Sequence, residues 1–183
     1  MLFRSDWVEL INRTDQSLAI SGYTLSDDPD FPNRFTFAEG TIIPANGFLV
    51  LTAATELPFQ LSAEGESLQL FDNSGQRIDH IRFGRQIPDT TLSRFQGSIW
   101  QLGHPTPLTQ NQSHLIGDPV SVRIEEFLTQ PRIDFDPGEF LELQNHSHLP
   151  VALSDLHLSD TPEIAPQKEG FPPLSYQIGR AHV

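Results

Sequence analysis

Short runs of alternating apolar and polar residues, separated by polar turns, recur along the chain. In Trp7–Ile11, Val8 and Leu10 fall on one side and the remaining residues on the other, which is the period of a half-buried β-strand. Comparable runs are Leu18–Leu25, Phe35–Phe37, Phe48–Leu51, Ser67–Phe71, Arg77–Phe83, Leu92–Phe95, Ile99–Leu102, Val122–Leu128 and Phe140–Gln144. Many short strands with Gly- and Pro-rich turns predict an all-β fold of the β-sandwich type.

The strand pattern is repeated within the chain. Within the segments Asp6–Asp28 and Gly138–Asp160, matched residues such as Glu9 and Glu142 align without a gap at an offset of 142 − 9 = 133 residues. Such a fixed offset indicates two copies of one structural unit. We therefore expect three pairs of equivalent buried positions, namely Leu10 with Leu143, Ile20 with Leu153, and Leu25 with Leu158.

Both copies end their first strand with asparagine, Asn12 and Asn145. Asparagine bonds its own main chain and tolerates left-handed backbone, so we predict a turn at each position.

The chain has 183 residues, no cysteine and a net charge of −13, with 7 basic and 13 acidic residues up to Gln112 and 4 and 11 after it. Nucleic-acid binding requires clustered cations that displace phosphate counterions, and this composition lacks them. The same argument disfavours anionic membrane surfaces. We predict no nucleic-acid partner and no membrane insertion, because no run reaches the length of a spanning helix.

Several motifs in order carry a family resemblance. The segments DWVELIN, SGYTLSDDPD, AEGTIIPANGFLVL, LSAEGESLQLFDNSGQRIDHIRFG and SRF, followed by W, PTP and N, resemble the lamin-tail domain. The resemblance covers Ser5–Asn111 and, more weakly, Val122–Tyr176. It implies an immunoglobulin-like β-sandwich. Similar bacterial domains occur, sometimes in tandem, in large exported or surface-associated chains, where they look like non-catalytic interaction or spacer modules.

The resemblance and the repeat together predict the domain organisation. We expect a lamin-tail-like β-sandwich without a full first strand over residues 1–112, a linker over 113–119 and a truncated second copy over 120–177. Residues 178–183 break the pattern and are interpreted as a non-native tail. The second copy is expected to be a partial sheet, disordered after about Pro162. Its opening strand, Val122–Leu128, either stays in that sheet or supplies the missing first strand of the first copy.

Asp27, Asp28 and Asp30 are the candidate metal ligands, because hard oxygen donors on a short loop suit calcium. Their spacing is not that of an EF-hand, and the second copy keeps only Asp160. We favour a structural turn in which aspartate bonds its own backbone. We therefore predict no cofactor, and calcium bound at this loop is the alternative.

Other chemistry has weaker support in the sequence. His146, His148 and His157 are interpreted as exposed loop residues rather than a metal site. Glu9 and Glu142 recur in the two copies and are expected to face solvent or a cross-strand arginine. No serine lies in a GxSxG elbow and no glycine-rich phosphate loop is present, so the sequence does not predict an enzyme.

The leading hypothesis is a non-catalytic interaction or structural module of a larger, exported bacterial protein, located outside the cell or on its surface by resemblance alone. Its expected partner is a protein or a cell-surface component. The alternative is a calcium- or carbohydrate-binding accessory domain of an enzyme encoded outside this segment.

Overall fold

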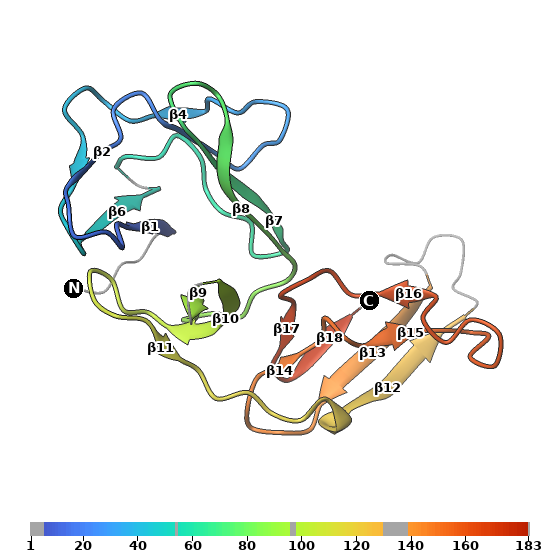
Figure 1. The fold of residues 1–183 in the computed structure, drawn as a ribbon. Coiled ribbons are helices and arrows are strands. Elements are labelled where there is room, and N and C mark those ends of the chain that lie inside the picture. The colour runs from blue at the N-terminus through green and yellow to red at the C-terminus, as the bar shows by residue number, and fades with distance from the viewer. Residues whose placement is uncertain (1–5, 54, 96–97, 130–138, 183) are drawn as a thin grey trace. The chain divides into compact units, whose positions relative to one another are not determined.

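The computed structural model describes residues 6–53, 55–95, 98–129 and 139–182. The chain divides into two compact units, each described here by itself (Figure 1). Unit 1 comprises Met1–Phe83 and Pro105–Gln112, and unit 2 comprises Gly84–His104 and Ser113–Val183. Among the described residues the regular elements are strands and one 3-10 turn, η1 (Pro119–Ser121), and the strand pairs whose register is defined are antiparallel. The predicted all-β class is confirmed.

Unit 1 contains the strands of the first copy. They are β1 (Trp7–Ile11), β2 (Leu18–Ala19), β3 (Thr24–Ser26), β4 (Phe35–Thr36), β5 (Ile42–Ile43), β6 (Phe48–Thr52), β7 (Glu66–Phe71) and β8 (Arg77–Phe83). Strand β1 pairs with β6, β2 pairs with β5, and the order β4-β3-β7-β8 forms a four-stranded sheet.

The core of unit 1 lies between these sheets. Val8 of β1 and Leu51 of β6 are buried in one cluster with Leu25 of β3, while Leu68 and Leu70 of β7 pack against that cluster. Because side chains alternate along β1, the strand places Val8 and Leu10 on the side of this cluster, and Ile11 remains 46% exposed. Two layers with one shared apolar core form a β-sandwich.

Unit 2 combines a hairpin with the second copy. Its strands are β9 (Thr91–Phe95), β10 (Ile99–His104), β12 (Val122–Leu128), β13 (Phe140–Asn145), β14 (Val151–Ala152), β15 (His157–Leu158), β16 (Glu169–Gly170), β17 (Tyr176–Gln177) and β18 (Arg180–His182), and β11 (Gln112–Ser113) crosses the boundary between the units. The sheets are β12-β13-β18, β14-β17, β15-β16 and β11-β10-β9.

The pairings of the two copies correspond. The pair β14-β17 repeats β2-β5, β15-β16 repeats β3-β4, and β13-β18 repeats β1-β6. The expected equivalence of Ile20 and Leu153 is confirmed by exposures of 2% and 3%. In each of the other two pairs only one residue is buried. Leu25 and Leu143 are enclosed, whereas their counterparts Leu158 and Leu10 keep intermediate exposure.

The turn predicted at Asn12 is present and is built around its buried side chain. Asn12 Nδ2 donates to the carbonyl oxygens of Gln16, Ile43 and Pro44 at 2.7, 3.1 and 2.9 Å. Its Oδ1 accepts from the backbone N–H of Thr14 at 3.0 Å. One side chain thus joins the end of β1 to the turn after β5.

Asn145 makes the equivalent contacts in unit 2. Its Nδ2 donates to the carbonyl oxygens of Leu149 at 2.8 Å and Gln177 at 3.0 Å, and its Oδ1 accepts from the N–H of Ser147 at 2.9 Å. These partners lie 133 residues beyond Gln16, Pro44 and Thr14, so the repeat is kept in hydrogen bonding as well as in sequence.

The hairpin β9-β10 lies in unit 2, whereas the sequence was interpreted as placing it within a first domain of residues 1–112. The backbone N–H of Leu102 donates to the hydroxyl oxygen of Tyr176 at 3.1 Å, and the N–H of Tyr176 donates to the carbonyl of Arg85 at 3.0 Å. A Cβ atom built on Gly84 would lie 1.9 Å from Ser175 Oγ, so only glycine permits this approach. Buried Tyr176 and Leu102 therefore join the hairpin to the second copy.

The chain after Pro162 differs from the expected disorder. It contains β16, β17 and β18, and β18 includes residues of the segment 178–183 that was interpreted as a non-native tail. The N–H of Asn145 donates to the carbonyl of Gly179 at 2.9 Å, just as Asn12 donates to Gly47 at 2.9 Å. Backbone pairing needs no particular side chain, so the apolar pattern gave no signal for this strand.

Candidate functional site

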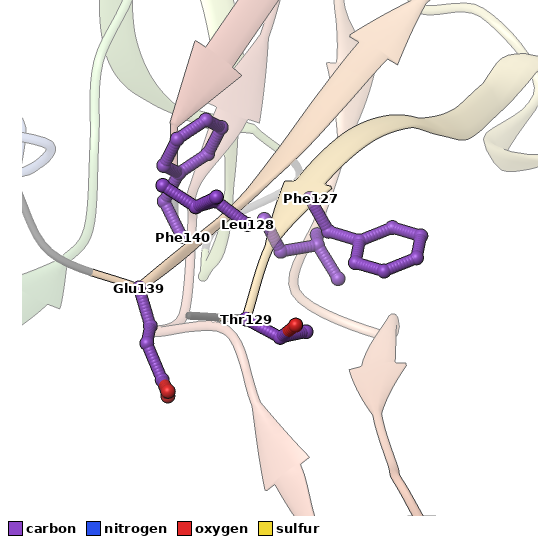
Figure 2. A pocket seen from close by; sticks show the side chains of 6 residues that line it. Phe127, Leu128, Thr129, Glu139 and Phe140 are labelled. Atoms are coloured by element: carbon purple, nitrogen blue, oxygen red, sulfur yellow. The ribbon is translucent and has the colours of Figure 1, made fainter. Parts of the chain in front are cut away.

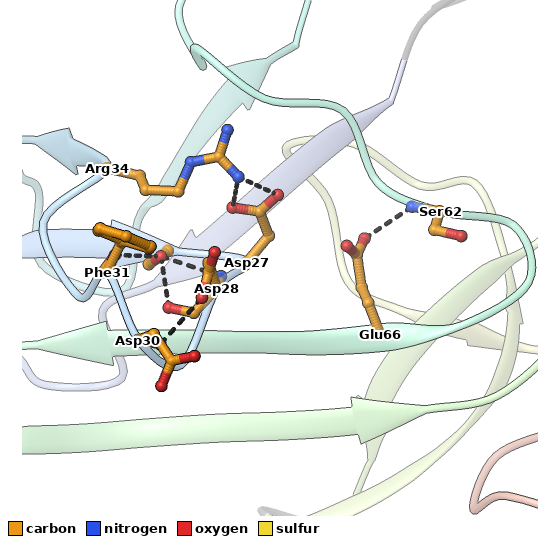
Figure 3. A network of polar contacts seen from close by, with 8 residues as sticks. Asp27, Asp28, Asp30, Phe31, Arg34, Ser62 and Glu66 are labelled. Atoms are coloured by element: carbon orange, nitrogen blue, oxygen red, sulfur yellow. Dashed lines mark hydrogen bonds and ion pairs between the residues drawn. The ribbon is translucent and has the colours of Figure 1, made fainter.

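The Asp-rich loop of unit 1 holds its first carboxylate in an ion pair. Both carboxylate oxygens of Asp27 accept from Arg34 Nη1, at 2.7 and 2.8 Å (Figure 3). The guanidinium of Arg34 also lies over the ring of Phe59, 5.3 Å from its centroid. The negative charge of Asp27 is therefore compensated by a protein cation.

Asp28 and Asp30 form a backbone turn. Asp28 Oδ1 accepts from the N–H of Asp30 at 2.9 Å, while Ser26 Oγ donates to the carbonyl oxygens of Asp28 and Phe31 (Figure 3). These are the local bonds by which Asp and Ser stabilise turns. Across the described ranges, no group of three or more His, Asp or Glu side chains is arranged to hold a metal ion.

The second copy keeps the same loop with other residues. Ser159 Oγ donates to the carbonyl of Ala165 at 2.7 Å, in the place of the bond from Ser26 to Phe31. Lys168 Nζ lies 2.7 Å from Asp160 Oδ1, in the place of the pair between Arg34 and Asp27. A carboxylate that faces a cation in both copies acts as a structural ion pair, which competes with calcium for the same oxygens.

Glu66 lies beside this loop (Figure 3). Its Oε1 accepts from the N–H of Ser62 at 2.7 Å. Partial burial raises the pKa of Glu66 above 4.5, and the charges of Asp27 and Asp6 add to the rise, while the Ser62 bond and Arg34 oppose it. Ionisation of the Glu66 carboxyl therefore costs more free energy in the folded protein than in the unfolded chain.

The recurring glutamates Glu9 and Glu142 lie in different units and differ in environment. Glu9 is partly buried, and its Oε2 accepts from the N–H of Leu108 at 2.6 Å. Desolvation raises the pKa of Glu9, and the Leu108 bond partly offsets the rise. Glu142 is only 4% exposed, so the expectation that it faces solvent is wrong. The alternation along the strand predicts which face of the sheet Glu142 lies on, but it does not predict which residues cover that face.

The three histidines of the second copy are not joined in a metal site among the described residues. His146 Nε2 lies 3.5 Å from Glu125 Oε2, and the ring of His157 lies beside Gly170. A different pair, His104 and His114, has ring centroids 4.5 Å apart. This contact was not predicted from the sequence, because nine residues lie between the two histidines and no shared periodicity links them.

Strand β12 forms an outer edge of its sheet and exposes apolar side chains. It spans seven residues, VRIEEFL, and among the described residues its one partner strand is β13, in the order β12-β13-β18. Ile124 and Phe127 are 58% and 66% exposed. Val122–Leu128 therefore opens the second copy and pairs there, which was one of the two arrangements considered from the sequence.

A shallow hollow of about 380 Å³ lies at one end of this strand pair (Figure 2). Six residues line it: Phe127, Leu128, Thr129, Glu139, Phe140 and Leu141. In Figure 2 the ring of Phe127 projects away from its strand. The hollow is mainly apolar and carries one carboxylate, which suits a side-chain contact better than catalysis.

Comparison with known proteins shows one similarity, over the first part of the chain. In the described part of the chain no helix is both long and apolar enough to cross a membrane. No curated protein matches the sequence, and no solved structure matches it. Residues 3–85 match the model of the Lamin Tail Domain family, whose fold is an immunoglobulin-like β-sandwich.

Proposed function

We propose that this chain is a non-catalytic interaction module, built from a lamin-tail sandwich and a second, lamin-tail-like copy. The observation that carries the proposal is the contrast between its polar and apolar groups. The candidate carboxylates make structural bonds, as Asp27 does with Arg34 and Asp28 with the backbone of Asp30. Large apolar side chains, by contrast, are exposed on the edge strand β12. Such a surface suits binding of another protein.

The context that we propose is a larger, exported bacterial protein that acts outside the cell or on its surface. The support is the resemblance of the sequence to lamin-tail domains, which in bacteria occur in exported or surface-associated chains. The uninterrupted reading frame tests this context. A leader and surface-anchoring modules beside these units are the expected finding, and a cytoplasmic enzyme fused to them would contradict it.

The function is tested by selection from a random peptide library displayed on phage against the intact, immobilised chain. We expect the selected peptides to converge on one pattern and to bind saturably. The alternative, a calcium- or carbohydrate-binding accessory domain, predicts that calcium raises the melting temperature or that a glycan array gives saturable binding. A glycan hit, or a calcium-induced rise that Asp28→Ala abolishes, without any peptide convergence would overturn the proposal.

A further inference from the structure

The two faces of β12 differ in chemistry because of a bulge. The cross-strand partners are Val122 with Asn145, Ile124 with Leu143, then Glu126 with Glu142 and Phe127 with Leu141, so that Glu125 is the extra residue. Residues that lie directly opposite each other on two neighbouring strands have their side chains on the same face of the sheet. The bulge therefore keeps Phe127 on the same face as Val122 and Ile124, where strict alternation would have turned it away.

This apolar face corresponds to the core face of unit 1. Leu141 and Leu143 occupy the repeat positions of Val8 and Leu10, which pack in the core that Leu68 and Leu70 of β7 join. In unit 2 the same face leaves Ile124 and Phe127 more than half exposed. In unit 1 the equivalent face is covered by apolar side chains, so the repeat indicates that apolar side chains of a partner suit the exposed row of Ile124 and Phe127.

The charge around β12 indicates which strand would bind. Glu125, Glu126 and Glu139 are exposed beside the apolar row. The Nη1 of Arg123 donates to the backbone carbonyls of Val120 and Val122, and Glu125 Oε2 lies 3.5 Å from His146 Nε2. Carboxylates on a strand edge repel other acidic edges, including those of a second copy of this chain with its net charge of −13. A basic strand would be attracted instead.

We propose that the outer edge of β12 is an acceptor for an extended, basic segment of a protein partner. The inference rests on the proposed function as an interaction module. The segment adds a strand to the sheet by main-chain hydrogen bonds, places apolar side chains beside Ile124 and Phe127, and places Lys or Arg beside Glu126 on the opposite face. It alternates apolar and basic residues with period two.

The test uses the intact chain and a fluorescent peptide of about ten residues, in which Val and Ile alternate with Lys and Arg. A sign-inverted peptide with Glu in place of Lys and Arg, and a peptide with the apolar residues grouped at one end, serve as comparisons. We expect binding of the alternating basic peptide alone, measured by fluorescence polarisation, and weaker binding at higher salt.

Two substitutions and two matched controls locate the site. Phe127→Ser and Glu126→Lys should each weaken binding about tenfold, because an aromatic anchor and a charge partner are lost. Ile164→Ser and Glu163→Lys alter other exposed residues of unit 2 and should leave binding within about twofold. Equal loss in the controls, equal binding of the sign-inverted peptide, or no effect of Phe127→Ser would overturn the acceptor site. If library peptides bind but are insensitive to Phe127→Ser, the proposed function stands and only this site is wrong.

Discussion

Replacement of Asn12 by alanine should strongly destabilise unit 1. Asn12 is 2% exposed, and its Nδ2 satisfies the carbonyls of Gln16, Ile43 and Pro44. The bond to Ile43 is buried, so its loss leaves an unsatisfied acceptor that costs about 1–3 kcal/mol. The two part-buried carbonyls can be hydrated, and loss of the turn bonds adds about 1 kcal/mol. We expect a total loss of about 3 kcal/mol in the free energy of unfolding.

The assay is urea unfolding followed by tryptophan fluorescence. Trp7 lies in unit 1 and Trp100 in unit 2, so a Trp100→Phe background makes fluorescence report on unit 1. Asn12→Ala should lower the urea midpoint by more than about 1 M. The exposed Asn33, replaced by alanine, is the matched control and should change the free energy of unfolding by less than about 0.5 kcal/mol. A loss below about 1 kcal/mol for Asn12→Ala, or equal losses for both variants, would refute the reasoning.

Three further perturbations follow from single contacts. Tyr176→Phe removes the acceptor of the buried N–H of Leu102 and should cost unit 2 about 1–3 kcal/mol, measured through Trp100 fluorescence in a Trp7→Phe background. The pKa of Glu66 is raised in the folded state, so the stability that its protonated carboxyl contributes is present below pH 4.5 and is lost as the pH rises through the folded-state pKa. The Glu66→Gln variant cannot ionise at this position, and it should therefore gain stability relative to the unchanged chain as the pH rises from acidic to neutral. Calcium should leave the melting temperature unchanged, because Asp27 is occupied by Arg34.

Each of these has a control. Tyr23→Phe should have little effect on unit 1, and a loss equal to that of Tyr176→Phe would show that the hydroxyl bond is unimportant. A pH-independent difference for Glu66→Gln would contradict the role of burial. A calcium-induced rise in melting temperature that persists in Arg34→Ala but disappears in Asp28→Ala would establish the loop as a calcium site.

The sequence predicted the features that depend on local pattern. Alternation and the offset of 133 gave the strands, the turns at Asn12 and Asn145, and the buried pair Ile20 and Leu153. The favoured structural role of the Asp-rich loop agrees with its bonds, because aspartate and serine act on neighbouring backbone groups. Such interactions reach only a few residues and are therefore visible in a sequence.

Features that depend on distant partners were not predictable. The hairpin β9-β10 would have the same alternation whether it joined the first or the second copy. Its position in unit 2 becomes apparent only from the hydrogen bond between Leu102 and Tyr176, which lies about 70 residues later in the chain. Glu142 is buried because of what covers its face, which periodicity does not report. The bulge at Glu125 requires knowledge of the β13 register, so the exposed row of Ile124 and Phe127 became apparent only in the structure.

The central claim, that the chain receives a partner strand at β12, is tested most directly by residue-resolved hydrogen exchange of the intact chain with and without the alternating basic peptide. Peptide binding should slow exchange of backbone amides within Val122–Leu128 by at least about tenfold, because strand addition gives the outward N–H groups partners. Amides of another edge strand, β8 (Arg77–Phe83) in unit 1, should be unchanged. Peptide binding with no slowing in Val122–Leu128, or with protection confined to β8, would contradict the account.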